Sequence, residues 1–167
     1  MKRLLFILPL LLLASCQEPP VINETLPQGD SYKESLINAN KVINSAEQTQ
    51  IEAYAQRRQW QMRQLDNGSY YEETLAGKGR KVDYDDTVSL RYSVDALNGK
   101  RLYTDVATTV VVGQHKPTVG VDRALMEMRR GGKARLILPS SLAYGVVGDG
   151  DQVPGRTVLV FAIEIID

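Results

Sequence analysis

The hydrophobic pattern in the later part of the chain is mainly the two-residue period of half-buried β-strands. Apolar and polar residues alternate from Val88 to Val94, and the apolar residues between Leu159 and Ile165 share one face. Short β-prone runs also occupy residues 70–75, 109–112 and 134–138. Such a series of short strands joined by turns favours an antiparallel sheet.

One short segment in this region has helical spacing instead. Its apolar residues fall on one face, with charged residues, Asp122 among them, on the other, and Gly131-Gly132 ends it. The residues of the apolar face are Val121, Ala124, Leu125 and Met128. The pattern therefore predicts an α+β fold in which a curved antiparallel sheet wraps one short helix, over residues 67–167.

A helical arm is expected before this domain, over residues 31–66, with the clearest helical spacing in residues 31–63. Ser31 and Glu34 form a possible capping box, and apolar residues then recur every three or four positions. A break near Asn44 would split the arm into two helices. The apolar stripe is narrow, so two roles stay open: an arm packed on the domain, or one that pairs with another copy of the chain.

The first residues have the pattern of a secretory signal. Met1-Lys2-Arg3 is basic, and residues 4–13 are apolar but too few to span a bilayer. The sequence around Cys16, Leu-Ala-Ser-Cys, resembles the lipobox of bacterial lipoproteins, in which the peptide is cut before the cysteine and that cysteine carries lipid. The resemblance implies a signal peptide over residues 1–15 and lipidation of Cys16. Residues 16–30, rich in proline, are expected to form an extended tether.

Charge and composition exclude several classes of function. The chain has 20 basic and 20 acidic side chains, so no basic surface favours binding of nucleic acid. With one His and one Cys, it lacks the ligands of the usual zinc, haem or iron–sulfur sites. No glycine-rich nucleotide motif opens a helix. We therefore expect a protein that works without metal or cofactor.

Residues 82–167 resemble the FKBP-type peptidyl-prolyl isomerase domain. The motifs that carry the resemblance are Asn98-Gly99-Lys100, Met128-Arg129-Arg130-Gly131-Gly132, Ala143-Tyr144-Gly145 and Leu159-Val160-Phe161. Their order and spacing agree over about half of the chain. Together with the lipobox and the arm, the chain also resembles FKBP-type lipoproteins of Bacteroides-like bacteria, including those linked to gliding motility.

The resemblance implies roles for individual residues. Tyr92, Tyr144 and Phe161 match the aromatic residues of the family's catalytic pocket. The substrate-binding positions implied are Leu102, Tyr103, Thr118, Val121 and Val153, with Thr118 offering its backbone N–H to the ligand. The sequence departs from the family pattern at several positions. Val121 replaces the usual Trp, Leu102-Tyr103 replaces a Phe-Asp pair, an aromatic residue expected near Thr108 is missing, and Pro117 replaces a small aliphatic residue. Because Val is smaller than Trp, we expect either a pocket wider than is usual in the family or one in which Tyr103 fills the space beside Val121.

Two functions follow from the resemblance. The first is a prolyl isomerase of the cell envelope that acts on proline-containing polypeptides and assists the folding of exported proteins. The second is a non-catalytic FKBP-like lipoprotein that serves as a binding module or scaffold. In either case the expected location is the outer membrane, facing the periplasm, with display on the cell surface left open.

Overall fold

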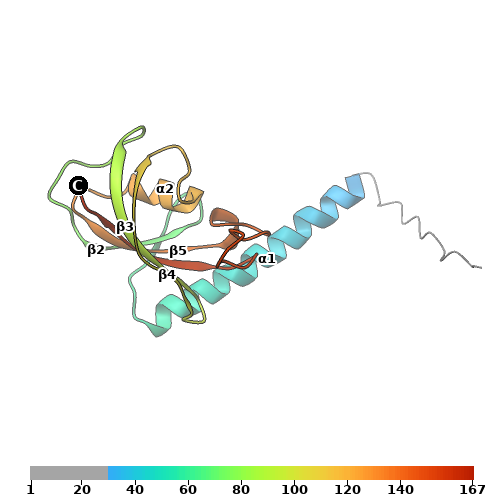
Figure 1. The fold of residues 1–167 in the computed structure, drawn as a ribbon. Helices are drawn as coiled ribbons and strands as arrows, with labels where there is room; N and C mark the ends of the chain where they lie inside the picture. Colours follow the sequence, from blue (N-terminus) through green and yellow to red (C-terminus); the bar gives the residue numbers. More distant parts are fainter. Residues whose placement is uncertain (1–29) are drawn as a thin grey trace, which may run out of the picture.

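A computed structural model describes residues 30–167, so the predicted signal peptide, Cys16 and almost all of the tether lie outside the described residues. The core of the fold is one six-stranded antiparallel sheet in the order β1-β2-β5-β6-β3-β4 (Figure 1). The strands are β1 (Arg63–Gln64), β2 (Tyr70–Leu75), β3 (Thr87–Ala96), β4 (Arg101–Val111), β5 (Lys133–Leu138) and β6 (Leu159–Ile165). The helices are α1 (Asp30–Arg57), α2 (Val119–Leu125) and the 3-10 turn η1 (Ser140–Leu142). The predicted α+β fold is confirmed.

The sheet curves around α2 and buries its main core between them (Figure 1). Strand β6 shows how the sequence separates the two faces: Leu159, Phe161 and Ile163 pack in the core with α2, whereas Val160 lies on the opposite face. This alternation is the two-residue period seen in the sequence. The face turned toward α2 is called the inner face below, and the other the outer face.

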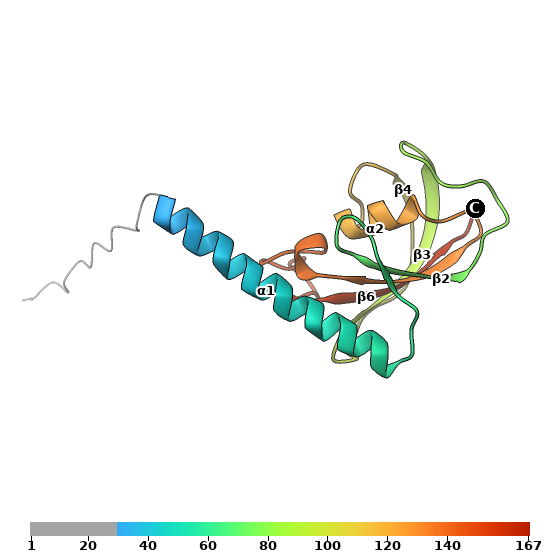
Figure 2. The same ribbon diagram turned by 180° about the vertical axis from the view of Figure 1, so that it is seen from behind.

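Helix α1 lies along the outer face of the sheet (Figure 2). Its C-terminal half buries Ile51 and Tyr54 against Ile137 of β5 and Val160 of β6, with ring centroids of Tyr54 and Trp60 5.6 Å apart. The N-terminal half projects beyond the sheet and is largely exposed. Within residues 30–167, no helix combines the length and apolar character needed to cross a bilayer.

The predicted arm differs from the structure in two respects. The helix is continuous through Asn44, so the possible break does not occur. It ends at Arg57 rather than near residue 63, and residues 63–64 form strand β1, which pairs with β2 at the edge of the sheet. A two-residue strand is too short to show a period in the sequence, and for this reason the helical spacing predicts a helix that is longer than the one observed.

Candidate functional site

Three tyrosine rings gather on the inner face of the sheet. Tyr92 of β3, Tyr103 of β4 and Tyr144 of the β5–β6 loop are each partly buried and pack against the main core. Tyr92 lies over Phe161, with ring centroids 5.8 Å apart and planes tilted by 47°. We call Tyr92, Tyr103 and Tyr144 the tyrosine cluster.

A buried apolar layer supports the tyrosine cluster. Phe161 and Val121 are fully buried, and Leu102 and Val153 are 4% exposed. The structure therefore brings most of the predicted site residues into one core cluster, with the three tyrosines at its exposed side. Phe161 lies against the Tyr92 ring, and Val121 belongs to the same buried core cluster; we call these two residues the apolar floor. Their predicted catalytic and binding roles stay predictions.

Irregular pairing of β3 with β4 explains how Leu102 and Tyr103 both contact the core. The register shifts between Tyr92 and Val94, and again between Val94 and Asp95. Each shift places an extra residue in β4, so neighbouring side chains no longer alternate strictly between the faces. Leu102 is thereby buried while Tyr103 packs beside it at the edge of the core.

The hydroxyl of Tyr103 donates a hydrogen bond to the carboxylate of Asp149, in the β5–β6 loop. Asp149 also accepts bonds from the backbone N–H groups of Asp151 and Val153, at 2.9 and 2.8 Å. The bond to Asp149 and, after it, burial raise the pKa of Tyr103 to about 12. Burial works to raise the pKa of Asp149, but the bonds from Tyr103 and the two N–H groups lower it overall.

Tyr103 thus joins strand β4 to the β5–β6 loop. Whether Tyr103 fills the space beside Val121 or leaves a wider pocket stays a prediction. In the sequence, Asp149-Gly150-Asp151 is an acidic loop segment whose spacing does not fit a calcium-binding motif. Within residues 30–167, no three His, Cys, Asp or Glu side chains are grouped to hold a metal ion. The feature that sequence reasoning missed is that Asp149 holds Tyr103.

Tyr144 is held by a compact loop. The N–H of Gly145 donates to the carbonyl of Ser140 at 2.8 Å, and the N–H of Arg156 donates to the carbonyl of Gly145 at 2.7 Å. Further along, Gly148 has φ +84°, and a Cβ there would lie 2.1 Å from the carbonyl oxygen of Val153. Only glycine therefore permits this crossing of the loop.

Both remaining tyrosine hydroxyls stay protonated at neutral pH. Burial raises the pKa of Tyr92 above its ordinary value. Burial, and then the neighbouring Tyr92 and Asp149, raise the pKa of Tyr144. A protonated phenol can donate a hydrogen bond, so Tyr144 has the chemistry needed to bind a substrate carbonyl.

Thr118 is the N-cap of α2: its side-chain oxygen accepts a hydrogen bond from the N–H of Val121 at 3.3 Å. The first N–H groups of a helix lack partners within the helix, which suits the expected use of the Thr118 N–H as a donor. That use stays a prediction.

Asp122 corrects the predicted solvent face of α2. Its carboxylate is buried and accepts hydrogen bonds from the N–H groups of Gly113, at 2.8 and 3.0 Å, and His115, at 3.2 Å. The imidazole of His115 also lies 3.1 Å away and is largely exposed, as expected of a loop residue. Asp122 therefore fastens the β4–α2 loop to the helix that follows it. The partners of Asp122 are backbone N–H groups of the preceding loop, so the helical period of the sequence, which shows only the apolar face, does not predict its burial.

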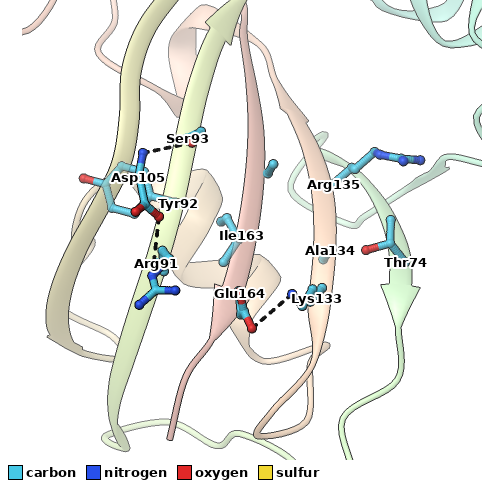
Figure 3. A pocket seen from close by; sticks show the side chains of 11 residues that line it. Thr74, Arg91, Tyr92, Ser93, Asp105, Lys133, Ala134, Arg135, Ile163 and Glu164 are labelled. Atoms are coloured by element: carbon cyan, nitrogen blue, oxygen red, sulfur yellow. Dashed lines mark hydrogen bonds and ion pairs between the residues drawn. The ribbon is translucent and has the colours of Figure 1, made fainter.

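A hollow of about 320 Å³ lies on the outer face (Figure 3). Its lining includes Tyr92 and five charged residues, and the charged side chains are already paired. Arg91 pairs with Asp105 at 3.4 Å, Lys133 with Glu164 at 3.1 Å, and Arg135 with Glu72 at 3.0 Å. A paired, polar lining does not favour an apolar proline ring. The tyrosine cluster remains the better candidate site.

Comparison with known proteins decides the family. The family model for FKBP-type peptidyl-prolyl cis-trans isomerase matches residues 78–166, just over half of the chain. The chain belongs to the FKBP-type isomerase family. The three residues of the tyrosine cluster, and Phe161 and Val121, all fall within the matched residues.

Several individual proteins are similar to this FKBP-type chain. Peptidyl-prolyl cis-trans isomerase FKBP53 of Arabidopsis thaliana is 35% identical over 114 residues, which cover 64% of this chain and 24% of the relative. A probable FKBP-type isomerase of Haemophilus influenzae is 30% identical over 103 residues, covering 60% of this chain and 43% of the relative. The chain thus spans less than half the length of these relatives.

A solved structure shows the same FKBP-type fold. The crystal structure of a peptidyl-prolyl cis-trans isomerase from Pseudomonas syringae has a TM-score of 0.63 and 30% identity, and covers 76% of this chain and 93% of its own. The predicted family resemblance is therefore confirmed. The whole of helix α1 precedes the residues that the family model matches.

Proposed function

We propose that this chain is a peptidyl-prolyl cis-trans isomerase whose substrate proline binds at the tyrosine cluster. The observation that carries the proposal is that Tyr92 and Tyr144, partly exposed, pack against the buried core cluster that contains Phe161 and Val121, with the Tyr92 ring against Phe161. Such a surface is apolar where a proline ring would lie and has hydroxyl donors at its edge.

The reaction needs no nucleophile. Rotation about an X–Pro bond crosses a barrier of about 18–20 kcal/mol, because the planar amide is stabilised by resonance. The twisted transition state has lost that conjugation and is less polar, so an apolar surface favours it over the planar ground state. In this proposal the floor removes water from the proline, and the Tyr144 hydroxyl orients a substrate carbonyl.

A protease-coupled assay on an Xaa-Pro peptide tests the proposal. Wild-type protein should accelerate isomerisation, and Tyr144→Phe should lower kcat/KM by about tenfold, the effect of about 1.4 kcal/mol in the transition state. Tyr32→Phe, on the projecting half of α1, is the matched control and should retain full activity. A wild-type rate equal to that of buffer would refute the proposal.

The second candidate is a non-catalytic binding module, and one contact favours it. The bond from Tyr103 to Asp149 ties the β5–β6 loop to β4 across the site, where the family pattern has a Phe-Asp pair. If this bond closes the site to catalysis, the protein would bind proline-containing segments without accelerating their isomerisation. Peptide binding in an NMR titration, together with a rate equal to that of buffer, would support this alternative.

We also propose that the protein is lipid-anchored in the outer membrane through Cys16, facing the periplasm. The support is the sequence of residues 1–16 and the following tether, all outside the described residues. Labelling with a fatty-acid analogue should modify the wild-type chain, and Cys16→Ser should abolish both the label and membrane association. Protease treatment of intact cells would separate display on the surface from a periplasmic location.

Self-association through residues 31–63 remains a proposal for the projecting part of α1. Three apolar side chains there are exposed by 48–67%: Leu36, Ile37 and Val42. Exposed apolar residues on one projecting helix favour pairing with a second copy. Light scattering on residues 17–167 should give twice the monomer mass, and a monomer mass would exclude this pairing.

A further inference from the structure

A buried carboxylate connects helix α1 to the loop that carries Tyr144. Glu47 is 6% exposed, and its two oxygens accept hydrogen bonds from the backbone N–H of Ser140, at 2.8 Å, and from the Ser140 hydroxyl, at 2.6 Å. The two residues are 93 positions apart in the sequence. Both views of the fold show the middle of α1 beside this loop (Figures 1 and 2).

Ser140 in turn controls the short segment that contains Tyr144. Its carbonyl oxygen accepts hydrogen bonds from the N–H groups of Ala143, at 3.2 Å, and Gly145, at 2.8 Å. These two residues flank Tyr144 directly. Fixing the backbone of Ser140 therefore fixes both neighbours of the Tyr144 backbone.

Helix α1 also holds the two ends of this loop. Ile137, just before it, and Val158, at its end, pack with Ile51 of α1 in one buried cluster. The loop is thus held by apolar contacts at its ends and by Glu47 at η1. Because a buried carboxylate without partners is costly, the two bonds to Ser140 strongly favour one position of the loop relative to α1.

We propose that Glu47 is a positioning residue for the isomerase site: by binding Ser140 it holds Tyr144 over the apolar floor. The inference rests on the proposed function for its effect on catalysis. Its structural part, the coupling of α1 to the Tyr144 loop, can be tested separately. The consequence is that an element lying outside the matched family domain sets the geometry of the site.

Three variants of the full chain test the coupling. Glu47→Ala removes both bonds. Glu47→Gln can keep both, since the amide oxygen can accept from the Ser140 N–H and the amide NH₂ can donate to the Ser140 hydroxyl. Gln50→Ala is the matched control, because Gln50 lies one turn further along α1 and is exposed. Amide hydrogen exchange at Ala143 and Gly145 and kcat/KM on an Xaa-Pro peptide are measured for each.

In Glu47→Ala, the amide hydrogen of Gly145 should exchange at least about tenfold faster than in wild type, while the amides of β6 stay protected. Its kcat/KM should fall by about tenfold, with the loss mainly in kcat. Glu47→Gln should restore both values to within about twofold, and Gln50→Ala should match wild type. If Glu47→Gln restores the exchange rate and kcat/KM, then residue 47 acts through its hydrogen bonds to Ser140 and not through its negative charge.

Two results would overturn the proposal: wild-type exchange at Gly145 in folded Glu47→Ala, or equal damage from Glu47→Gln and Glu47→Ala. If Glu47→Ala does not fold, Ser140→Ala decides, since it loses only the hydroxyl bond and should speed Gly145 exchange by about threefold. If wild type is inactive, the proposed function fails, whereas the exchange data still decide whether Glu47 holds the loop.

Discussion

Replacing Tyr103 by Phe tests the link between strand β4 and the β5–β6 loop. Phenylalanine keeps the ring that packs on the core and removes only the hydroxyl that donates to Asp149. Hydrogen bonds to charged groups contribute about 1.5–3 kcal/mol, and solvent screening of this partly exposed pair reduces that figure. We expect the free energy of unfolding to fall by about 1 kcal/mol at pH 7.

The loss should depend on pH with a definite sign. The pKa of folded Asp149 lies below its ordinary value of 3.8, so its contribution to stability is present above that value. The contribution is lost as the pH falls from about 3.8 through the folded-state pKa, because over that range the unfolded chain binds more protons than the folded one. The difference in stability between wild type and Tyr103→Phe should therefore shrink below about pH 4.

Urea unfolding followed by far-ultraviolet circular dichroism at pH 7 and pH 3 measures this difference. The m-value should not change, since the same surface is exposed on unfolding. Tyr32→Phe is the control, with a side chain 38% exposed on α1. The reasoning is refuted if Tyr103→Phe matches wild type at pH 7, or if its loss is as large at pH 3 as at pH 7.

Two further substitutions probe the packing that supports the site. Ile51→Ala, at a fully buried position of α1, should lower the free energy of unfolding by about 2–5 kcal/mol. The control Val147→Ala, 82% exposed, should change it by no more than about 0.5 kcal/mol. Asp122→Asn should lower the free energy of unfolding by about 1–3 kcal/mol, because the new NH₂ group faces the N–H of Gly113 or His115. Asp151→Asn, at an exposed position, is the control. Equal stability of the two variants would contradict the buried role of Asp122.

The strands and the short helix could be predicted because their periods are local. Alternation from Val88 to Val94 and from Leu159 to Ile165 predicted β3 and β6, and the spacing of Val121, Ala124 and Leu125 predicted α2. Each pattern reflects burial on one face, which neighbouring residues reveal directly.

The contacts that organise the site could not be predicted in the same way. The shifts of register near Tyr103 depend on how β4 pairs with β3, and no residue type in the sequence of β4 predicts them. Glu47 and Asp122 look like solvent-exposed helix residues, yet both are buried by partners that only the tertiary fold supplies. Charged side chains are rarely buried without such partners, so their patterns predict exposure.

The most direct measurement is an NMR titration of the isotope-labelled chain with a short Xaa-Pro peptide. It locates the binding surface whether or not the reaction is accelerated. We predict the largest chemical-shift changes at Tyr92, Tyr144 and Val153, on the inner face. Changes confined instead to Lys133 and Glu164, in the outer hollow, or the absence of any change at millimolar peptide, would contradict a proline site at the tyrosine cluster.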